Sequence, residues 1–212
     1  MDFTWSGHEK SRYGFGVNDA NYKVTNKSSG WVCPYYRKWR SMINRCYSKV
    51  YQSTKPTYIG DSVCGEWEYF TKFREWMKNQ EWENLELDKD VIDFGNRVYS
   101  PEKCCFIPKS VNGFIRTNPR SSNSGFVGVH MLPNGKFESH FKNPITKKIE
   151  HIGTYIDPEY AHEMWRIKKL AVSKEIARSG IVKDKRASHG LLGIFEKEAW
   201  YTKNIYIYRG EK

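Results

Sequence analysis

The sequence predicts an α+β fold, and three observations support this prediction. Apolar residues recur at helical spacing after Pro34 and again over residues 66–79. Residues 85–115 have the pattern of a strand, a loop, a second strand and a helix. Further on, apolar and polar residues alternate over residues 136–142, and a long helical segment follows residue 157. We therefore expect N-terminal helices that brace a ββα element, followed by a three-stranded antiparallel sheet packed on one helix.

Two amphipathic helices are expected in the N-terminal half. Residues 1–32 are rich in glycine, asparagine and serine and predict an extended lead-in. Pro34 suits the first turn of the first helix, and residues 66–79 predict the second. We expect these helices to pack together through two apolar faces, formed by Tyr35, Trp39, Met42, Ile43 and Cys46 and by Trp67, Phe70, Phe73, Trp76 and Met77.

The ββα element carries the candidate chemistry. Asp88 ends the first alternating strand, Gly95-Asn96 predicts a turn, and Cys104–Ile107 predicts the second strand. Asn112 lies in the helix that follows. Hard divalent cations prefer oxygen ligands, so Asp88 and Asn112 on facing elements suit Mg²⁺ or a similar ion held against a phosphate. The alternative is that Asp88 is solvated charge at a strand end and Asn112 is a helix-terminus residue.

The C-terminal half predicts the sheet and its helix. Residues 116–124 are polar and rich in turn formers, which predicts a linker. Strands are expected over residues 126–130, 136–142 and 149–155. Asp157 and Pro158 predict the start of a helix that ends at Gly180. This helix is expected to bury Ala161, Met164, Trp165, Ala171 and Val172.

The last segment has a weaker pattern. Residues 183–186 predict a basic loop, and residues 205–208 alternate like an added strand. Together, these patterns predict a lead-in over residues 1–32, a first domain over 33–118, a second over 119–180 and an extension over 181–212.

Composition and charge indicate the partner. The chain has 212 residues, of which 39% are hydrophobic and 16% aromatic, enough for folded cores. Its net charge is +11 and its isoelectric point about 9.3, which favours a polyanion, and double-stranded DNA is the simplest. Basic residues dominate positions 20–60 and 103–156, with an acidic block between them. This pattern suits a metal site between DNA-binding surfaces or ordinary charged helix faces.

No run approaches the roughly 20 apolar residues of a membrane span, and the N-terminus lacks a signal-peptide pattern. Five irregularly spaced cysteines favour a reducing, cytoplasmic compartment. A structural zinc site built from Cys33, Cys46, Cys64 and Cys104 or Cys105 stays an alternative, although no Cys-x-x-Cys pair anchors it.

Residues from about Gly16 to Ala177 resemble bacteriophage HNH-type homing endonucleases. In the first half the resemblance lies in Cys33-Pro34-Tyr35-Tyr36, Trp39…Met42…Arg45-Cys46-Tyr47, Val63-Cys64-Gly65-Glu66-Trp67, Leu87-Asp88-Lys89-Asp90, Gly95-Asn96, Tyr99-Ser100-Pro101-Glu102 and Phe106…Asn112. The second half is similar to ethylene-response-factor DNA-binding domains, through Gly125-Phe126-Val127-Gly128-Val129, Gly135-Lys136-Phe137, Ile152-Gly153-Thr154-Tyr155 and Ala161-His162-Glu163-Met164-Trp165.

The resemblance implies a metal-dependent DNA endonuclease or nickase acting in a bacterial host cell. Catalytic roles would fall to Asp88, Lys89, Asp90, Asn96, Tyr99 and Asn112, with Asp88 and Asn112 as metal ligands. The outer face of the sheet would read DNA, which places His130, Glu138, His140, Lys142 and His151 toward the duplex. The full set expected to contact DNA is Arg37, Lys38, Arg116, Arg120, His130, Lys136, His140, Lys142, Lys148 and His151.

The chain departs from the family at two places. Lys89 stands where the general-base histidine is usual. A charged lysine can stabilise a phosphate and becomes a base only if its pKa is depressed, so Tyr99, Asp90 and Glu102 are alternative proton acceptors. Histidine and lysine replace arginine and tryptophan on the sheet face, which weakens bidentate reading of guanine. Two other hypotheses therefore stay open: a catalytically inactive protein that represses or occludes DNA, and an inhibitor directed at an acidic protein. The sequence leaves both monomer and homodimer open.

Overall fold

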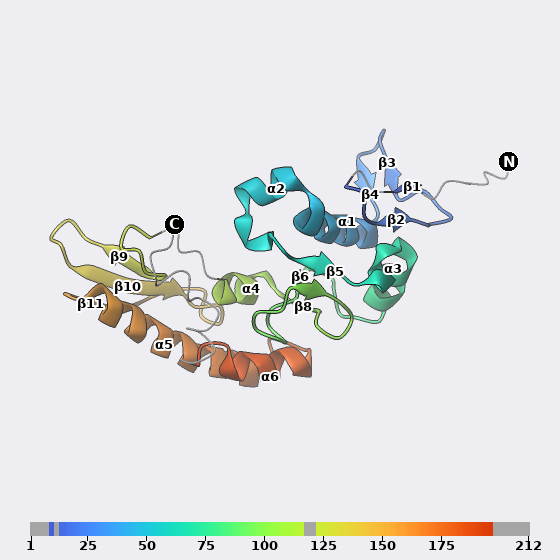
Figure 1. Cartoon of the computed structure of the whole chain (residues 1–212). Coiled ribbons are helices and arrows are strands. Elements are labelled where there is room, and N and C mark those ends of the chain that lie inside the picture. The colour runs from blue at the N-terminus through green and yellow to red at the C-terminus, as the bar shows by residue number, and fades with distance from the viewer. Residues whose placement is uncertain (1–8, 11–12, 117–121, 197–212) are drawn as a thin grey trace. The chain divides into compact units, whose positions relative to one another are not determined.

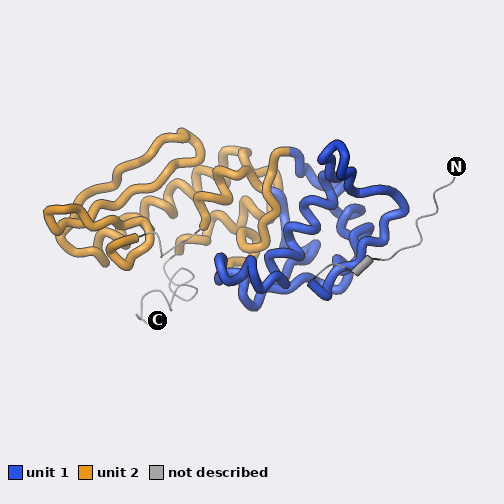
Figure 2. Tube along the Cα trace, turned by 90° about the horizontal axis from the view of Figure 1, so that it is seen from above, with its two compact units in different colours: residues 1–83, 96–106 blue, residues 84–95, 107–212 orange. Residues whose placement is uncertain are grey.

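The structure is a computed structural model that describes residues 9–10, 13–116 and 122–196 (Figure 1). It is a mixed α+β structure, which confirms the predicted class at this level. The chain forms two compact units (Figure 2). The first contains residues 1–83 and 96–106, and the second contains residues 84–95 and 107–212.

Two packed helices form the core of the first unit. Helix α1 spans Pro34–Tyr47 and packs against helix α3, which spans Phe70–Lys78. The indole of Trp39 in α1 donates a hydrogen bond of 2.8 Å to the backbone carbonyl of Trp67. Trp39 and Trp67 are both fully buried, which confirms the predicted contact between the two apolar faces.

The second predicted helix is divided in two. A 3₁₀ turn, η2, covers Gly65–Glu68, and α3 begins only at Phe70. Between them Tyr69 has an extended backbone, with φ −91° and ψ 126°. The apolar stripe therefore continues past the extended residue Tyr69, where the helix is interrupted. This is why the periodicity of the stripe predicted one helix.

Short elements complete the first unit. Two-residue strands form antiparallel pairs in the predicted lead-in and one parallel pair beyond it, and short helices follow α1. The paired strands are β1 (Glu9–Lys10) with β2 (Val17–Asn18), β3 (Thr25–Asn26) with β4 (Trp31–Val32), and β5 (Ser62–Val63) with β7 (Val98–Tyr99); the short helices are α2 (Lys49–Thr54) and η1 (Pro56–Tyr58).

The second unit begins with the predicted strand and helix that carry the candidate site. Strand β6 spans Leu85–Asp88 and forms a two-stranded sheet with β8, Cys105–Pro108, whose first two residues are still counted in the first unit. Helix α4, Lys109–Ile115, follows β8 directly and packs against β6. The order strand, strand, helix is as predicted.

A three-stranded antiparallel sheet covered by one long helix forms the rest of the second unit. The strands β9 (Val129–Met131), β10 (Phe137–Lys142) and β11 (Ile149–Tyr155) have the order β11-β10-β9. Helix α5, Pro158–Ser179, packs against all three, as predicted. Strand β9 begins later than residue 126, because Gly128 has φ +74° and lies directly beneath the indole of Trp165.

Two predictions for the C-terminal part are wrong. Ala171 is exposed on α5, whereas Lys169, Val172 and Ser173 on either side of it belong to the buried face. Residues 185 and 186 are not in a loop: helix α6 covers Lys185–Gly193 and is capped by Asp184, whose carboxylate accepts the N–H groups of Arg186 and Ala187. The predicted strand over residues 205–208 lies outside the described residues. Across the described ranges, no helix is both long and apolar enough to cross a membrane.

Candidate functional site

Asp88 ends strand β6 and organises the turn that follows. Its Oδ1 accepts two backbone hydrogen bonds, of 2.9 Å from the N–H of Asp90 and 2.8 Å from that of Val91. Aspartate is favoured in such turns because its short side chain can hold the backbone two and three residues ahead. These bonds fix the orientation of the carboxylate and occupy one of its two oxygens.

The carboxylate of Asp88 is buried, with 8% of the residue exposed. Burial raises the pKa of this carboxyl above its usual value, and the neighbouring charge of Asp90 raises it further. The two backbone bonds and Lys89 act in the opposite direction. Within the described part of the chain, no hydrogen bond uses the second oxygen, Oδ2. A divalent cation at that oxygen would offset the cost of keeping the acid ionised.

Asn112 lies on α4, the helix that packs against β6. It is 5% exposed and belongs to the buried face of the helix with Val111, Phe114 and Ile115. Its carboxamide makes no hydrogen bond with another residue that the structure describes. Its carboxamide is therefore available to a ligand. Carboxylate and carboxamide oxygens, as on Asp88 and Asn112, are of the kind that a hard divalent cation takes.

Lys89 is held as a charged group. Its ammonium lies 3.1 Å from Oδ1 and 3.2 Å from Oδ2 of Asp90, and its side chain is only 6% exposed. Pairing with a carboxylate favours the charged form of a lysine, which argues against Lys89 as the general base. It does suit the neutralisation of negative charge on a phosphate.

Asn96 and Tyr99 belong to the first unit, whereas Asp88 belongs to the second. The amide of Asn96 donates to the carbonyl of Val98 (2.7 Å) and accepts from its N–H (3.1 Å), so Asn96 shapes the turn after Gly95. Tyr99 is buried and hydrogen-bonded to Arg45, and burial raises the pKa of its hydroxyl well above the usual value. Tyr99 therefore lies in the core of the first unit.

The outer face of the sheet gathers the predicted histidines around one glutamate. His130 is the cross-strand partner of Glu138, and His140 is the partner of His151. Imidazole nitrogens of His151 and His140 lie 3.1 Å and 3.5 Å from the two carboxylate oxygens of Glu138. The rings of His130 and His140 stack with centroids 5.0 Å apart. Three histidines that are expected to contact DNA thus lie around one acid, Glu138, on the central strand β10.

The other residues expected to contact DNA are spread over both units. Lys136, Lys142 and Lys148 are exposed at or beside the strands of the sheet. Arg116 is exposed directly after α4. Arg37 is exposed and Lys38 half-buried on α1 in the first unit. Arg120 lies outside the described residues.

Helix α5 carries a buried polar stripe that the sequence analysis missed. His162, Arg166, Lys169 and Ser173 are all buried and recur every three or four residues. Each makes a side-chain hydrogen bond to a backbone carbonyl of another segment, on Val127, Phe195, Phe114 and Leu191 respectively. The bond from Lys169 to Phe114 holds the end of α4, two residues beyond Asn112. The signal that could have revealed the stripe is its helical spacing.

The described residues bring together no three histidine, cysteine, aspartate or glutamate side chains that could hold a metal ion. All five cysteines are free thiols, and those of the zinc alternative form no such cluster. The pair of Asp88 and Asn112 is a different kind of donor set, because it combines one carboxylate with one carboxamide. Comparison with protein-family models, with curated proteins and with solved structures finds no match to this chain.

Proposed function

We propose that this protein is a metal-dependent DNA endonuclease or nickase with an HNH-like ββα site. One observation carries the proposal. Asp88 and Asn112 are buried on two elements that pack together, and neither the second oxygen of Asp88 nor the amide of Asn112 is bonded within the described residues. Side-chain oxygens that no described protein group uses are available to a ligand that is bound there in use.

The chemistry follows from what each side chain can do. A bound Mg²⁺ would supply Lewis-acid stabilisation of charge on a phosphodiester. Asp88, oriented by its two backbone bonds, and Asn112 would hold the cation. Lys89 would neutralise charge on the phosphate. Of the proton acceptors that the sequence leaves open, Asp90 is the one that shares the loop of Asp88, so we assign it the activation of water.

DNA is the proposed partner because the chain has a net charge of +11. Such a charge favours a polyanion, and the basic residues Lys136, Lys142 and Lys148 are exposed at or beside the strands of the sheet in the second unit. The five free thiols suit the reducing cytoplasm of a host cell.

The test is plasmid nicking with Mg²⁺, Mn²⁺ and Zn²⁺, with Asp88→Ala as the variant. We expect this substitution to reduce the nicking rate by about 100-fold or more, because even partners of metal ligands contribute about 10–100-fold. Asp93→Ala is the matched control, since Asp93 is an exposed acid of the same loop. Equal nicking rates for the wild-type protein and a clean Asp88→Ala preparation would contradict the proposal.

A second candidate function is DNA binding without cleavage. The ion pair between Lys89 and Asp90 favours it, because an ammonium and a carboxylate that bind each other are less able to activate water. Retarded migration of DNA in a gel, without cleavage in any of the three metals, would support this second function.

A further inference from the structure

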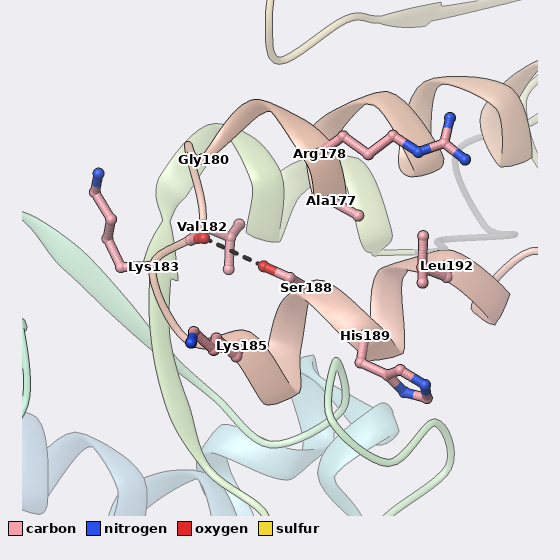
Figure 3. A pocket seen from close by; sticks show the side chains of 9 residues that line it. All are labelled: Ala177, Arg178, Gly180, Val182, Lys183, Lys185, Ser188, His189 and Leu192. Atoms are coloured by element: carbon pink, nitrogen blue, oxygen red, sulfur yellow. Dashed lines mark hydrogen bonds between the residues drawn. The ribbon is translucent and has the colours of Figure 1, made fainter.

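A groove lies between the end of α5 and helix α6 in the second unit (Figure 3). It has a volume of about 520 Å³. Ala177, Val182 and Leu192 provide apolar surface, and Gly180 turns the chain from one helix toward the other with φ +74°. The groove is therefore part of the folded framework and involves neither Asp88 nor the sheet face.

Four basic side chains border this groove. Lys183 and Lys185 lie toward the end near Gly180, whereas Arg178 and His189 lie toward the other end (Figure 3). All four are exposed. None of them makes an ion pair or a side-chain hydrogen bond with another described residue.

The neighbouring basic residues behave differently. Lys174 on α5 pairs with Glu196 at 3.1 Å, and Arg186 on α6 pairs with Asp184 at 2.6 Å. The positive charges of Arg178, Lys183 and Lys185 beside the groove are thus left without a counter-charge in the described structure, while those of Lys174 and Arg186 are neutralised. Separated cations beside an apolar surface fit a sugar-phosphate backbone, whose phosphates meet the cations and whose sugars meet the apolar side chains.

Helix α6 is also seated against the loop of the candidate site. A Cβ atom added at Gly190 would overlap the backbone carbonyl of Val91. The N–H of the same Val91 is bonded to the carboxylate of Asp88. The helix that borders the groove therefore packs directly on the turn that orients Asp88, and both lie in one unit.

From this geometry we infer that the groove bordered by Arg178, Lys183, Lys185 and His189 binds phosphates of the DNA molecule that is cleaved at Asp88. The inference rests on the proposed function and adds a contact surface to it. The contacts are with the sugar-phosphate backbone of DNA, so they position the duplex and strengthen binding equally for all DNA sequences. Because helix α6 packs on Val91, DNA that is bound in the groove is held in a defined position relative to Asp88.

The test is the affinity of the full chain for a fluorescent DNA duplex, measured by anisotropy in EDTA. We expect Lys183→Ala/Lys185→Ala to weaken binding about tenfold near 0.1 M salt. We also expect the slope of log Kd against log salt to fall by about 1 for each phosphate contact removed. Lys168→Ala/Lys174→Ala is the control, because it removes the same charge from α5 at residues already paired with Glu150 and Glu196.

The outcomes separate this inference from the proposed function. Equal affinities of the two double variants overturn the groove as a DNA contact, whatever the nicking assay shows. A selective loss for Lys183→Ala/Lys185→Ala supports it even if no metal produces nicking, since EDTA removes cleavage from the measurement. If the double variant loses binding to vesicles of acidic lipid but not to DNA, the groove serves a membrane and the inference is wrong.

Discussion

At the scale of single residues, the carboxyl of Asp88 in the candidate site lowers the stability of the fold when it is ionised. The folded chain raises the pKa of the Asp88 carboxyl, mainly by burial. An acid with a raised folded-state pKa contributes stability below its ordinary pKa, and this contribution is lost as pH rises through the folded-state value. Near neutral pH, ionised Asp88 is thus a cost that a cation would reduce.

Asp88→Asn tests this cost. Asparagine keeps an oxygen that can accept from the N–H groups of Asp90 and Val91, so we expect the variant to be at least as stable as the wild-type protein without metal. Mg²⁺ at about ten times its Kd should stabilise the wild-type protein by about 1.4 kcal/mol and leave the variant unchanged. Thermal unfolding with and without Mg²⁺ measures both effects. Equal stabilisation of the two proteins would remove Asp88 from the metal site.

Lys169 is the second costly residue. Its ammonium lies 3.7 Å from the ring centroid of Phe114 and 4.8 Å from those of Trp165 and Phe195, without a carboxylate in the described contacts. Burial lowers the pKa of this lysine well below its usual value. The unfolded chain then binds the proton more tightly, so stability rises as pH increases from the folded-state pKa to the ordinary lysine value.

Lys169→Met should raise the free energy of unfolding by about 1–2 kcal/mol at neutral pH, because a buried amine is replaced by an apolar chain of similar length. The rise in stability with alkaline pH should also disappear. Urea unfolding over a pH series measures both. Lys168→Met, at the half-exposed neighbour, should stay within about 0.5 kcal/mol of the wild-type value. A destabilised Lys169→Met would show that the bond to the Phe114 carbonyl outweighs the burial cost.

At the scale of elements, close packing decides where the elements begin and how they sit. The polar stripe of α5 is buried beside the apolar residues that its sequence predicts, and its bonds reach backbone carbonyls before β9, in α4 and in or just after α6. Each bond gives a buried polar side chain of α5 a partner on the backbone of another part of the chain. The helix can therefore bury polar side chains while exposing Ala171.

Gly128→Ala tests the packing of α5 on the sheet. An alanine Cβ would overlap the indole of Trp165, and φ is +74°, so we expect a loss of about 2–4 kcal/mol from overpacking and backbone strain. Gly135→Ala is the control: its φ is +77° but no atom lies within 4 Å, so strain alone should cost about 1 kcal/mol. Urea unfolding compares the two. Equal losses would show that Trp165 moves aside freely.

Predictions at this scale succeeded where local pattern suffices. Pro34 starts α1, and Asp157 caps α5 through a bond to the N–H of Tyr160, both as predicted. They failed where a partner element decides. Helix α6 was missed because its apolar residues are few, and its seat on Val91 depends on a loop about 100 residues earlier in the chain.

At the scale of the whole molecule, the two units are discontinuous in the sequence. Residues 84–95 belong with the C-terminal half, whereas residues 96–106 belong with the N-terminal helices. A change in composition predicts a single boundary between consecutive domains. It therefore cannot predict a unit that is built from separated segments of the chain. The net charge of +11, in contrast, is a property of the whole sequence and needs no packing to be known.

The sequence by itself determined the α+β class, the strand, strand and helix around Asp88 and Asn112, and the three-stranded sheet on its helix. Periodicity and capping residues act over a few neighbours, so they can be read without coordinates. Only the tertiary structure decided that Asp88, Asn112 and Lys169 are buried, that Lys89 is paired with Asp90, and that α6 lies on the Asp88 turn. Burial, pKa and close approach depend on segments far apart in the chain, and only folding brings those segments together.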